Sequence, residues 1–307
     1  LVAQNLQSYL KGDNDAKWWG IGISIMATQA SAITFLSTPG QAYSDGMRFI
    51  QFYFGLPIAM IILSVTFLPI FYKLKVFTAY EYLESRFDLK TRLLAALLFL
   101  LQRGLAAGIT IYAPSIILST LLGWNLNWTN IFIGSLVILY TVSGGTKAVT
   151  QTQKQQMAVM MGGMILAGII VVNMLPKEIS FIDALHIAGK MEKLNLINFD
   201  FDLNDRYNFW TGTTAALFLF LSYFGTDQSQ VQRYLTGKSL SQSRLGLMMN
   251  GLLKIPMQFI ILFIGVMVFV FYQFNTPPVF FNKVELNKVK INTNQSKLLM
   301  KIDILSS

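Results

Sequence analysis

Three kinds of polar side chain interrupt the apolar segments of this sequence and could bind a solute or an ion. Gln29, Ser31 and Thr34 lie in the first apolar segment, and Arg103 lies in the third. An amide or a guanidinium in such surroundings needs several hydrogen-bonding partners or an aqueous cavity, because a polar group in hydrocarbon is costly. These residues therefore predict a binding site inside an apolar protein.

Other roles remain open for these residues. Ser31 and Thr34 could serve only to let helices pack closely, as small polar residues commonly do. Arg103 could contact a substrate or pair with an acid, and an acidic partner must come from another helix because its sequence neighbours offer none. We expect Lys254, near the start of the last apolar segment, to extend its amine to the cytoplasmic surface.

The residue types that carry most enzymatic chemistry are scarce. Cysteine is absent and His186 is the only histidine, so disulfides, cysteine nucleophiles, thiolate metal sites and multi-histidine metal sites are excluded. No set of acids, bases or metal ligands converges at one depth of the apolar segments. We therefore do not expect an enzyme.

Composition indicates a protein that spans a membrane. Of the 307 residues 53% are hydrophobic and only 13% are charged, and the mean hydropathy is +0.50, whereas soluble domains carry roughly 25% charged residues. Apolar runs of about 17 to 25 residues, the length that crosses a bilayer, recur along the chain. We count seven apolar segments: one that begins at Trp18, then 49–71, 93–122, 128–140, 157–175, 209–224 and 245–274.

The net charge of +9 does not indicate nucleic-acid binding, because the basic residues are scattered and form no patch with interleaved aromatic residues. Lysine and arginine in short loops instead indicate orientation. By this rule the loops around 72–92, 141–156 and 225–244 are cytoplasmic, and the polar interval 176–208 is external.

The first and sixth segments are both interrupted by polar or helix-breaking residues. In transporters built from inverted repeats, a pair of interrupted helices in corresponding positions is the best sequence pointer to the binding site. The first segment turns polar at 29–34, and the sixth breaks at 225–228. We therefore expect an unwound stretch near 29–34 opposite one near 223–227, with free carbonyls that could hold a cation.

Two further positions have structural interpretations. Asp227 follows the break in the sixth segment, where it could cap the next helix or bind a cation, and we favour capping. Gly144 and Gly145 predict a tight turn between the fourth and fifth segments, because no strand context or following GK[ST] sequence supports a phosphate loop.

Four strings of residues, in the same order along the chain, resemble motifs of the sodium/solute symporter family. They are WWGIGISIMATQAS at 18–31, AYEYLESRF at 79–87, GGTKAV at 144–149 and DQSQVQRYL at 227–235. The resemblance implies an all-α polytopic membrane protein with the leucine-transporter fold. It also implies alternating access between two inverted five-helix repeats and sodium-coupled uptake.

The same resemblance implies the organisation of the chain. Residues 1–307 would form one transmembrane transporter domain with core helices one to seven, truncated at both ends. Residues 18–175 would be the first five-helix repeat and 209–274 the first two helices of the second. The interval 176–208 would be an external loop, and 275–307 an external loop or a truncated tail.

Candidate site residues also follow from the resemblance. The backbone carbonyls of Ala27 and Ala30 would supply half of a sodium site, whose hydroxyl ligands lie on a helix outside this sequence. The substrate-facing positions would be Gln29, Ser31, Thr34 and Tyr223, with Tyr223 closing over the bound solute.

One position departs from the family pattern. Members commonly carry Thr-Asp after the glycine pair, whereas this sequence has Thr152 and Gln153. The missing carboxylate makes a second, charge-dependent cation site doubtful. We therefore predict one coupled sodium ion.

The expected substrate is a small polar organic solute, first a sugar or a sugar acid such as sialic acid. The alternatives are a sodium-coupled monocarboxylate or anion symporter and a transporter-like solute-sensing domain. A channel is disfavoured because no filter-like loop repeats. We expect a multi-pass protein of the plasma membrane, namely a bacterial inner membrane. Its expected partners are the solute, sodium and the lipid bilayer, and its expected functional unit is a monomer.

Overall fold

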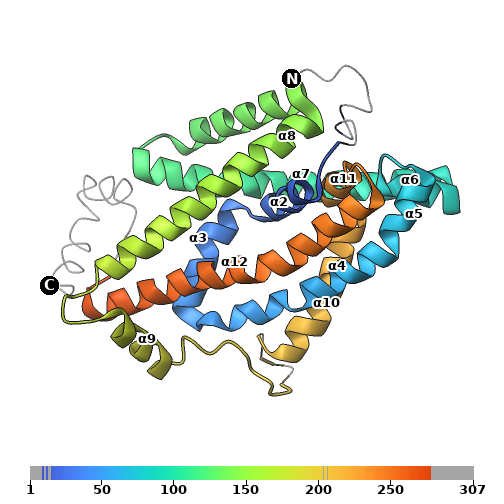
Figure 1. Ribbon diagram of the computed structural model, residues 1–307. Helices are drawn as coiled ribbons and strands as arrows, with labels where there is room; N and C mark the ends of the chain where they lie inside the picture. The colour runs from blue at the N-terminus through green and yellow to red at the C-terminus, as the bar shows by residue number, and fades with distance from the viewer. Residues whose placement is uncertain (1–8, 10–11, 13–14, 203, 206, 278–307) are drawn as a thin grey trace.

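The protein is all-helical over the residues that the structure, a computed structural model, describes: 9, 12, 15–202, 204–205 and 207–277. The expected tail at 275–307 lies mostly outside this range. The helices are α2 (Trp18–Gln29), α3 (Ala32–Asp45), η2 (Met47–Tyr53), α4 (Gly55–Val65), α5 (Phe67–Leu74), α6 (Ala79–Arg86), α7 (Leu89–Leu122), α8 (Leu126–Asn173), α9 (Phe181–Lys190), α10 (Phe209–Thr226), α11 (Gln228–Leu235) and α12 (Leu240–Phe274) (Figure 1).

Four helical stretches in the described part are long and apolar enough to cross a membrane. They are Met47–Leu74, α7, α8 and α12, and a fifth is added if α2 and α3, bent by 63° at their junction, form one span. The seven predicted segments therefore correspond to fewer candidate spans. Helix α8 joins the fourth and fifth segments into one helix, and the 18-residue α10, which contains the sixth segment, is not among the four.

The 48-residue α8 bends at the glycine pair. Gly145 has φ 55° and ψ −155°, a conformation that is not helical and that L-residues with a Cβ rarely adopt. The two halves of α8 therefore run in different directions (Figure 1), and the second half packs on α2 and α12. The predicted turn between the fourth and fifth segments is confirmed.

Side-chain caps fix where several helices begin. Asn208 and Thr211 form a reciprocal capping box at the start of α10, and Ser180 and Asp183 form another at the start of α9. In the second box, hydrogen bonds from Ser180 lower the pKa of Asp183 below its usual value. Thus the expected external loop 176–208 contains a capped helix, α9, which packs on the end of α12.

The centre of the protein is α12, which crosses the molecule and packs against α2, α3 and α4 (Figure 1). Its contacts run along its length: Trp18 donates its backbone N–H to Gln242 at one end (2.8 Å), and Gly265 lies against the Pro39 carbonyl near the other. By contrast, no residue in the most apolar stretch of α7 is buried within the protein, as expected of a surface that faces lipid.

Gly265 allows the closest of these approaches. A Cβ at this position would lie 2.1 Å from the Pro39 oxygen, a backbone atom that cannot turn away. We predict that Gly265→Ala destabilises the protein by ~1–3 kcal/mol through overpacking. Thermal unfolding in detergent measures the effect.

The matched control for this prediction is Gly162→Ala in α8, where a Cβ would meet nothing within 4 Å. It should be neutral or slightly stabilising, because alanine favours helix over glycine. Equal melting temperatures for the two variants would show that α12 and α3 are not in this close contact.

Candidate functional site

The break between α2 and α3 lies at the predicted interruption of the first segment. Helix α2 ends at Gln29, Ala30 has extended backbone (φ −85°, ψ 91°), and α3 begins at Ala32. The Ala30 N–H donates to the oxygens of Met26 (2.9 Å) and Ala27 (3.2 Å). The interruption near 29–34 is therefore confirmed at 30–31, and Thr34 lies within α3.

The break is surrounded mainly by apolar side chains. Ala27 and Ala30 are buried in a cluster with Met26, Met257 and Ile261. The Gln29 Oε1 atom is buried without a hydrogen-bond partner in the described part of the chain. An unpaired amide oxygen at this depth is costly. The roles of Ala27, Ala30, Gln29, Ser31 and Thr34 in binding stay predictions.

Tyr223 lines a different cavity. This cavity, of about 430 Å³, lies between α5, α6, α7 and α10 and includes Phe67, Tyr80 and Phe99, but not Gln29, Ser31 or Thr34. The Tyr223 hydroxyl accepts from Gln230 Nε2 at 2.8 Å. Its role as a lid over the substrate stays a prediction that these contacts do not support.

Arg103 has an acidic partner from outside its own helix, Asp227, as the sequence predicted. Its Nε and Nη2 atoms donate to the two carboxylate oxygens of Asp227, and Nη2 also donates to Ser229 Oγ at 2.6 Å. Its guanidinium carbon lies 5.7 Å from the centre of the Tyr223 ring. Protein acceptors thus use three of the five guanidinium N–H donors and pair the charge, which argues against Arg103 as the group that recognises a substrate.

Asp227 also caps α11, as favoured from the sequence. Its Oδ1 accepts from the Ser229 N–H at 2.9 Å, and the residue is only 7% exposed. The charge of Asp227 also acts on Tyr80 of α6. The pKa of Tyr80 is raised to about 12, first by burial of its hydroxyl and then by the negative charge of Asp227. Asp227 therefore joins α7, α10 and α11.

Lys254 is buried deep in α12 and does not lie at the surface. It is 0% exposed, and its Nζ has no partner among the residues described. The expectation that it reaches the cytoplasmic surface is wrong. Helix α12 begins at Leu240, so Lys254 lies roughly 21 Å along the axis at 1.5 Å per residue, too deep for its side chain to reach the helix end.

Lys254 is the middle of a polar stripe on α12. Asn250 and Gln258, one turn before and one turn after, are also 0% exposed. Asn250 contacts the Met60 sulfur at 3.7 Å and Gln258 donates to the Tyr53 hydroxyl at 3.0 Å, but the side-chain oxygen of each has no partner in the described chain. The spacing i, i+4, i+8 in an apolar helix is the signal that could have revealed the stripe.

The polar stripe and the break between α2 and α3 lie at a similar position along the axis of α12. Met257, between Lys254 and Gln258, packs in the cluster that contains Ala27 and Ala30. Toward one end of α12 the contact is Trp18 with Gln242, and toward the other it is Pro39 with Gly265. Along α12 the break at 30–31 therefore lies near the level of Lys254, while Asn250 and Gln258 contact Met60 of α4 and Tyr53 of η2.

Gln153 joins the second half of α8 to α2. Its Oε1 accepts from Ser24 Oγ at 2.6 Å, and its Nε2 donates to Thr28 Oγ1 at 2.7 Å. Both ends of the amide are thus occupied by protein hydroxyls. No group of three or more His, Cys, Asp or Glu residues that could hold a metal ion occurs in the described part of the chain.

Comparison with known proteins decides the family. The model of the Sodium:solute symporter family matches residues 9–300. The chain belongs to the sodium:solute symporter family. Its relatives include the human sodium/iodide cotransporter, 34% identical over 257 residues (82% of this chain and 39% of that protein). Another is the Xenopus laevis sodium-coupled monocarboxylate transporter 1, 33% identical over 244 residues (80% and 39%).

A solved structure is similar as well. It is a Na⁺-coupled sialic acid symporter in a substrate-bound outward-open state, 27% identical, with a TM-score of 0.84 over 92% of this chain and 60% of that one. The resemblance, the leucine-transporter-like fold class and the expectation of a transporter family rather than an enzyme are confirmed. The chain spans about two fifths of the curated relatives, and its division into repeats stays a prediction.

The Arg103–Asp227 pair should contribute to stability more than an exposed pair does. Removing either partner leaves a charge unpaired, so we expect Arg103→Gln and Asp227→Asn to destabilise the symporter chain individually. The double variant should lose less than the sum, with a coupling energy of about 0.5–3 kcal/mol. Thermal unfolding of the four proteins measures this coupling.

The control is the more exposed pair of Arg92 and Glu84, for which we expect a coupling of about 0.2–1 kcal/mol. Additive effects at Arg103 and Asp227 would mean that the two residues act independently, contrary to the geometry.

Proposed function

We propose that this chain is part of a sodium-coupled symporter that takes a small anion, and that Lys254 recognises the anion's charge. The observation that carries the proposal is a lysine amine that is fully buried and unpartnered within the described structure, near the level of the broken helix. Intramembrane ionisable residues of this kind are functional-site candidates.

The charge of Lys254 favours an anion over a neutral sugar. A buried ammonium is stabilised by a counter-charge, and no acidic residue forms an ion pair with Lys254 in the described part. A carboxylate or a halide would supply that charge, and the side-chain amides of Asn250 and Gln258 flank the ammonium one turn to either side. Of the expected substrates, sugar acids and monocarboxylates meet this requirement.

The names of similar proteins support an anion as the substrate. The relatives named above are described as carriers of iodide and of monocarboxylates, and the structural neighbour binds sialic acid, all of which are anions. A carboxylate could be recognised by Arg103 instead, but the guanidinium of Arg103 is bound to Asp227. Lys254 is the better candidate.

Sodium would bind where α2 is interrupted. We propose the carbonyls of Ala27 and Ala30 as two of its ligands, because the extended backbone at Ala30 departs from helical geometry just there. The neutral amide of Gln153, already bonded to Ser24 and Thr28, supports a single sodium ion. A cation and an anion at one depth in a low-dielectric interior attract each other, which would couple their binding.

The test replaces Lys254 by methionine, which keeps the length and removes the charge. We predict that Lys254→Met weakens binding of radiolabelled pyruvate or iodide at least about 30-fold, the cost of removing one partner of a buried charge pair. Equilibrium binding to the full-length symporter that contains this chain, in nanodiscs with sodium or with potassium, measures both the affinity and its dependence on sodium.

Two comparisons make the result specific. The control variant Lys73→Met, at an exposed lysine, should leave anion binding unchanged. In the absence of anion, Lys254→Met should raise the melting temperature, because it removes an unpaired buried charge. Unchanged anion affinity in a folded Lys254→Met protein would remove Lys254 from the site. Equal binding in sodium and potassium, or more than one sodium bound per anion, would contradict the sodium part.

A further inference from the structure

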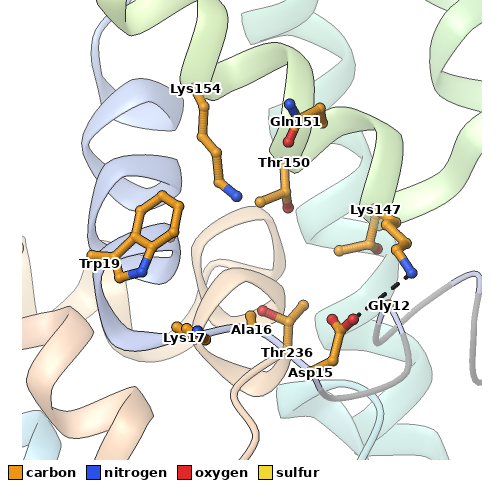
Figure 2. A pocket seen from close by; sticks show the side chains of 12 residues that line it. Gly12, Asp15, Ala16, Lys17, Trp19, Lys147, Thr150, Gln151, Lys154 and Thr236 are labelled. Carbon is orange, nitrogen blue, oxygen red and sulfur yellow. Dashed lines mark ion pairs between the residues drawn. The ribbon is translucent and has the colours of Figure 1, made fainter.

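A separate cavity lies at the beginning of α2, far along the chain from Lys254. Its volume is about 330 Å³, and it is enclosed by the segment before and at the start of α2, by α8 just after its bend, and by the turn between α11 and α12. Figure 2 shows the side chains that line it. The polar and aromatic ones used below are Lys17, Trp19, Lys147, Thr150, Lys154 and Thr236.

The cavity has an excess of positive charge. Three lysines line it, and the one carboxylate on its wall, Asp15, lies 3.8 Å from the amine of Lys147. In Figure 2 the amine of Lys154 points into the space between Trp19 and Thr150, whereas Lys147 turns toward Asp15. The Lys154 Nζ lies over the Trp19 ring, 4.8 Å from its centre, which is a cation–π distance.

The surroundings add further positive charge. Arg233, one turn before Thr236, has buried Nε and Nη1 atoms without partners among the described residues. Thr236 donates its hydroxyl to the Arg233 carbonyl at 2.7 Å. Burial lowers the pKa of Arg233 to about 10. Arg233 therefore stays charged near neutral pH and adds a positive charge one turn from Thr236.

These features form a site because of the fold and not because of local sequence. Lys17 precedes α2, while Lys147 and Lys154 are two turns apart on the second half of α8, which the bend at Gly145 directs along α2. Like charges from α8 and from the segment before α2 therefore meet at one cavity. An anion between them would offset their repulsion.

We propose that this cavity binds a phosphate group through Lys154 and Lys147, with Lys17 at its rim and the Thr150 hydroxyl beside it. Lysine is a common phosphate ligand, the volume is that of a ligand pocket, and a phosphate dianion would balance the net charge of the lining. Basic pockets between transmembrane helices are also sites for lipid head groups, so the phosphate could belong to a lipid or to a soluble compound.

Binding here would join two helices that already touch deeper in the protein. Ser24 and Thr28 of α2 contact Gln153 of α8, next to Lys154. A phosphate held by Lys17 and Lys154 would add a second link between α2 and α8. We therefore expect occupancy to stabilise the protein against thermal unfolding.

The experiment measures the melting temperature of the full chain in maltoside micelles, which carry no phosphate. One arm adds inorganic phosphate, with chloride at equal ionic strength as the reference. The other arm adds phosphatidylglycerol to the micelles. The test variant is Lys147→Gln/Lys154→Gln, and the matched control is Lys73→Gln/Lys90→Gln, two exposed lysines outside the cavity.

We expect stabilisation in at least one arm, kept in the control and weakened about fivefold in apparent affinity for each cavity lysine removed. Stabilisation by inorganic phosphate would indicate a soluble ligand, and stabilisation only by phosphatidylglycerol would indicate a lipid. The response must persist in Lys254→Met, which separates this site from the proposed anion site. If the double variant does not fold, Lys154→Gln alone serves as the test.

Two results would overturn the proposal. One is the absence of stabilisation in both arms. The other is equal stabilisation of a folded cavity variant and of its control, which would mean that the phosphate binds elsewhere.

Discussion

A helix that is broken inside a membrane leaves backbone groups without their usual partners, and the surrounding protein must supply others. Here α2 stops at Gln29, the chain is extended at Ala30, and α3 restarts at Ala32. Much of the remaining architecture surrounds this break. Helix α12 packs along both α2 and α3, and the second half of α8 packs along α2, so the break is enclosed on more than one side.

The enclosure explains why a lysine at this depth is informative. In water or at a bilayer surface the amine of Lys254 would be solvated, but close packing of α12 against α2, α3 and α4 leaves it fully buried. A charge in such a place costs free energy that a hydrophobic residue would not. A binding protein can offset this cost when an anion arrives, which connects the packing of α12 to the proposed selection of anions.

Sequence patterns predicted the features that depend on local chemistry. The polar residues at 29–34, the glycine pair at 144–145 and the capping position of Asp227 each predict a local backbone event, and each is found in the structure. The need of Arg103 for a partner was also evident, although its identity was not, because Asp227 is distant in sequence.

The sequence could not predict how deeply a residue is buried or which residues from distant parts of the chain surround it. Lys254 was expected near the membrane surface because the apolar run begins only at about residue 245, whereas α12 begins at Leu240. In addition, a run of apolar residues does not show which face of a helix other helices cover. The role of Tyr223 as a substrate lid stays a prediction. Its side chain lies beside Arg103 and Gln230, in a cavity that does not include Gln29, Ser31 or Thr34. Seven apolar segments became fewer candidate spans because the bent α8 merges two of them.

The most direct test of the anion site is anomalous diffraction from crystals of the chain grown in sodium iodide. The account predicts an iodide peak within about 4 Å of the Lys254 Nζ, the distance of an ion pair, beside Asn250 and Gln258. A bound iodide found only near Arg103 or in the lysine-lined cavity, with none at Lys254, would contradict it.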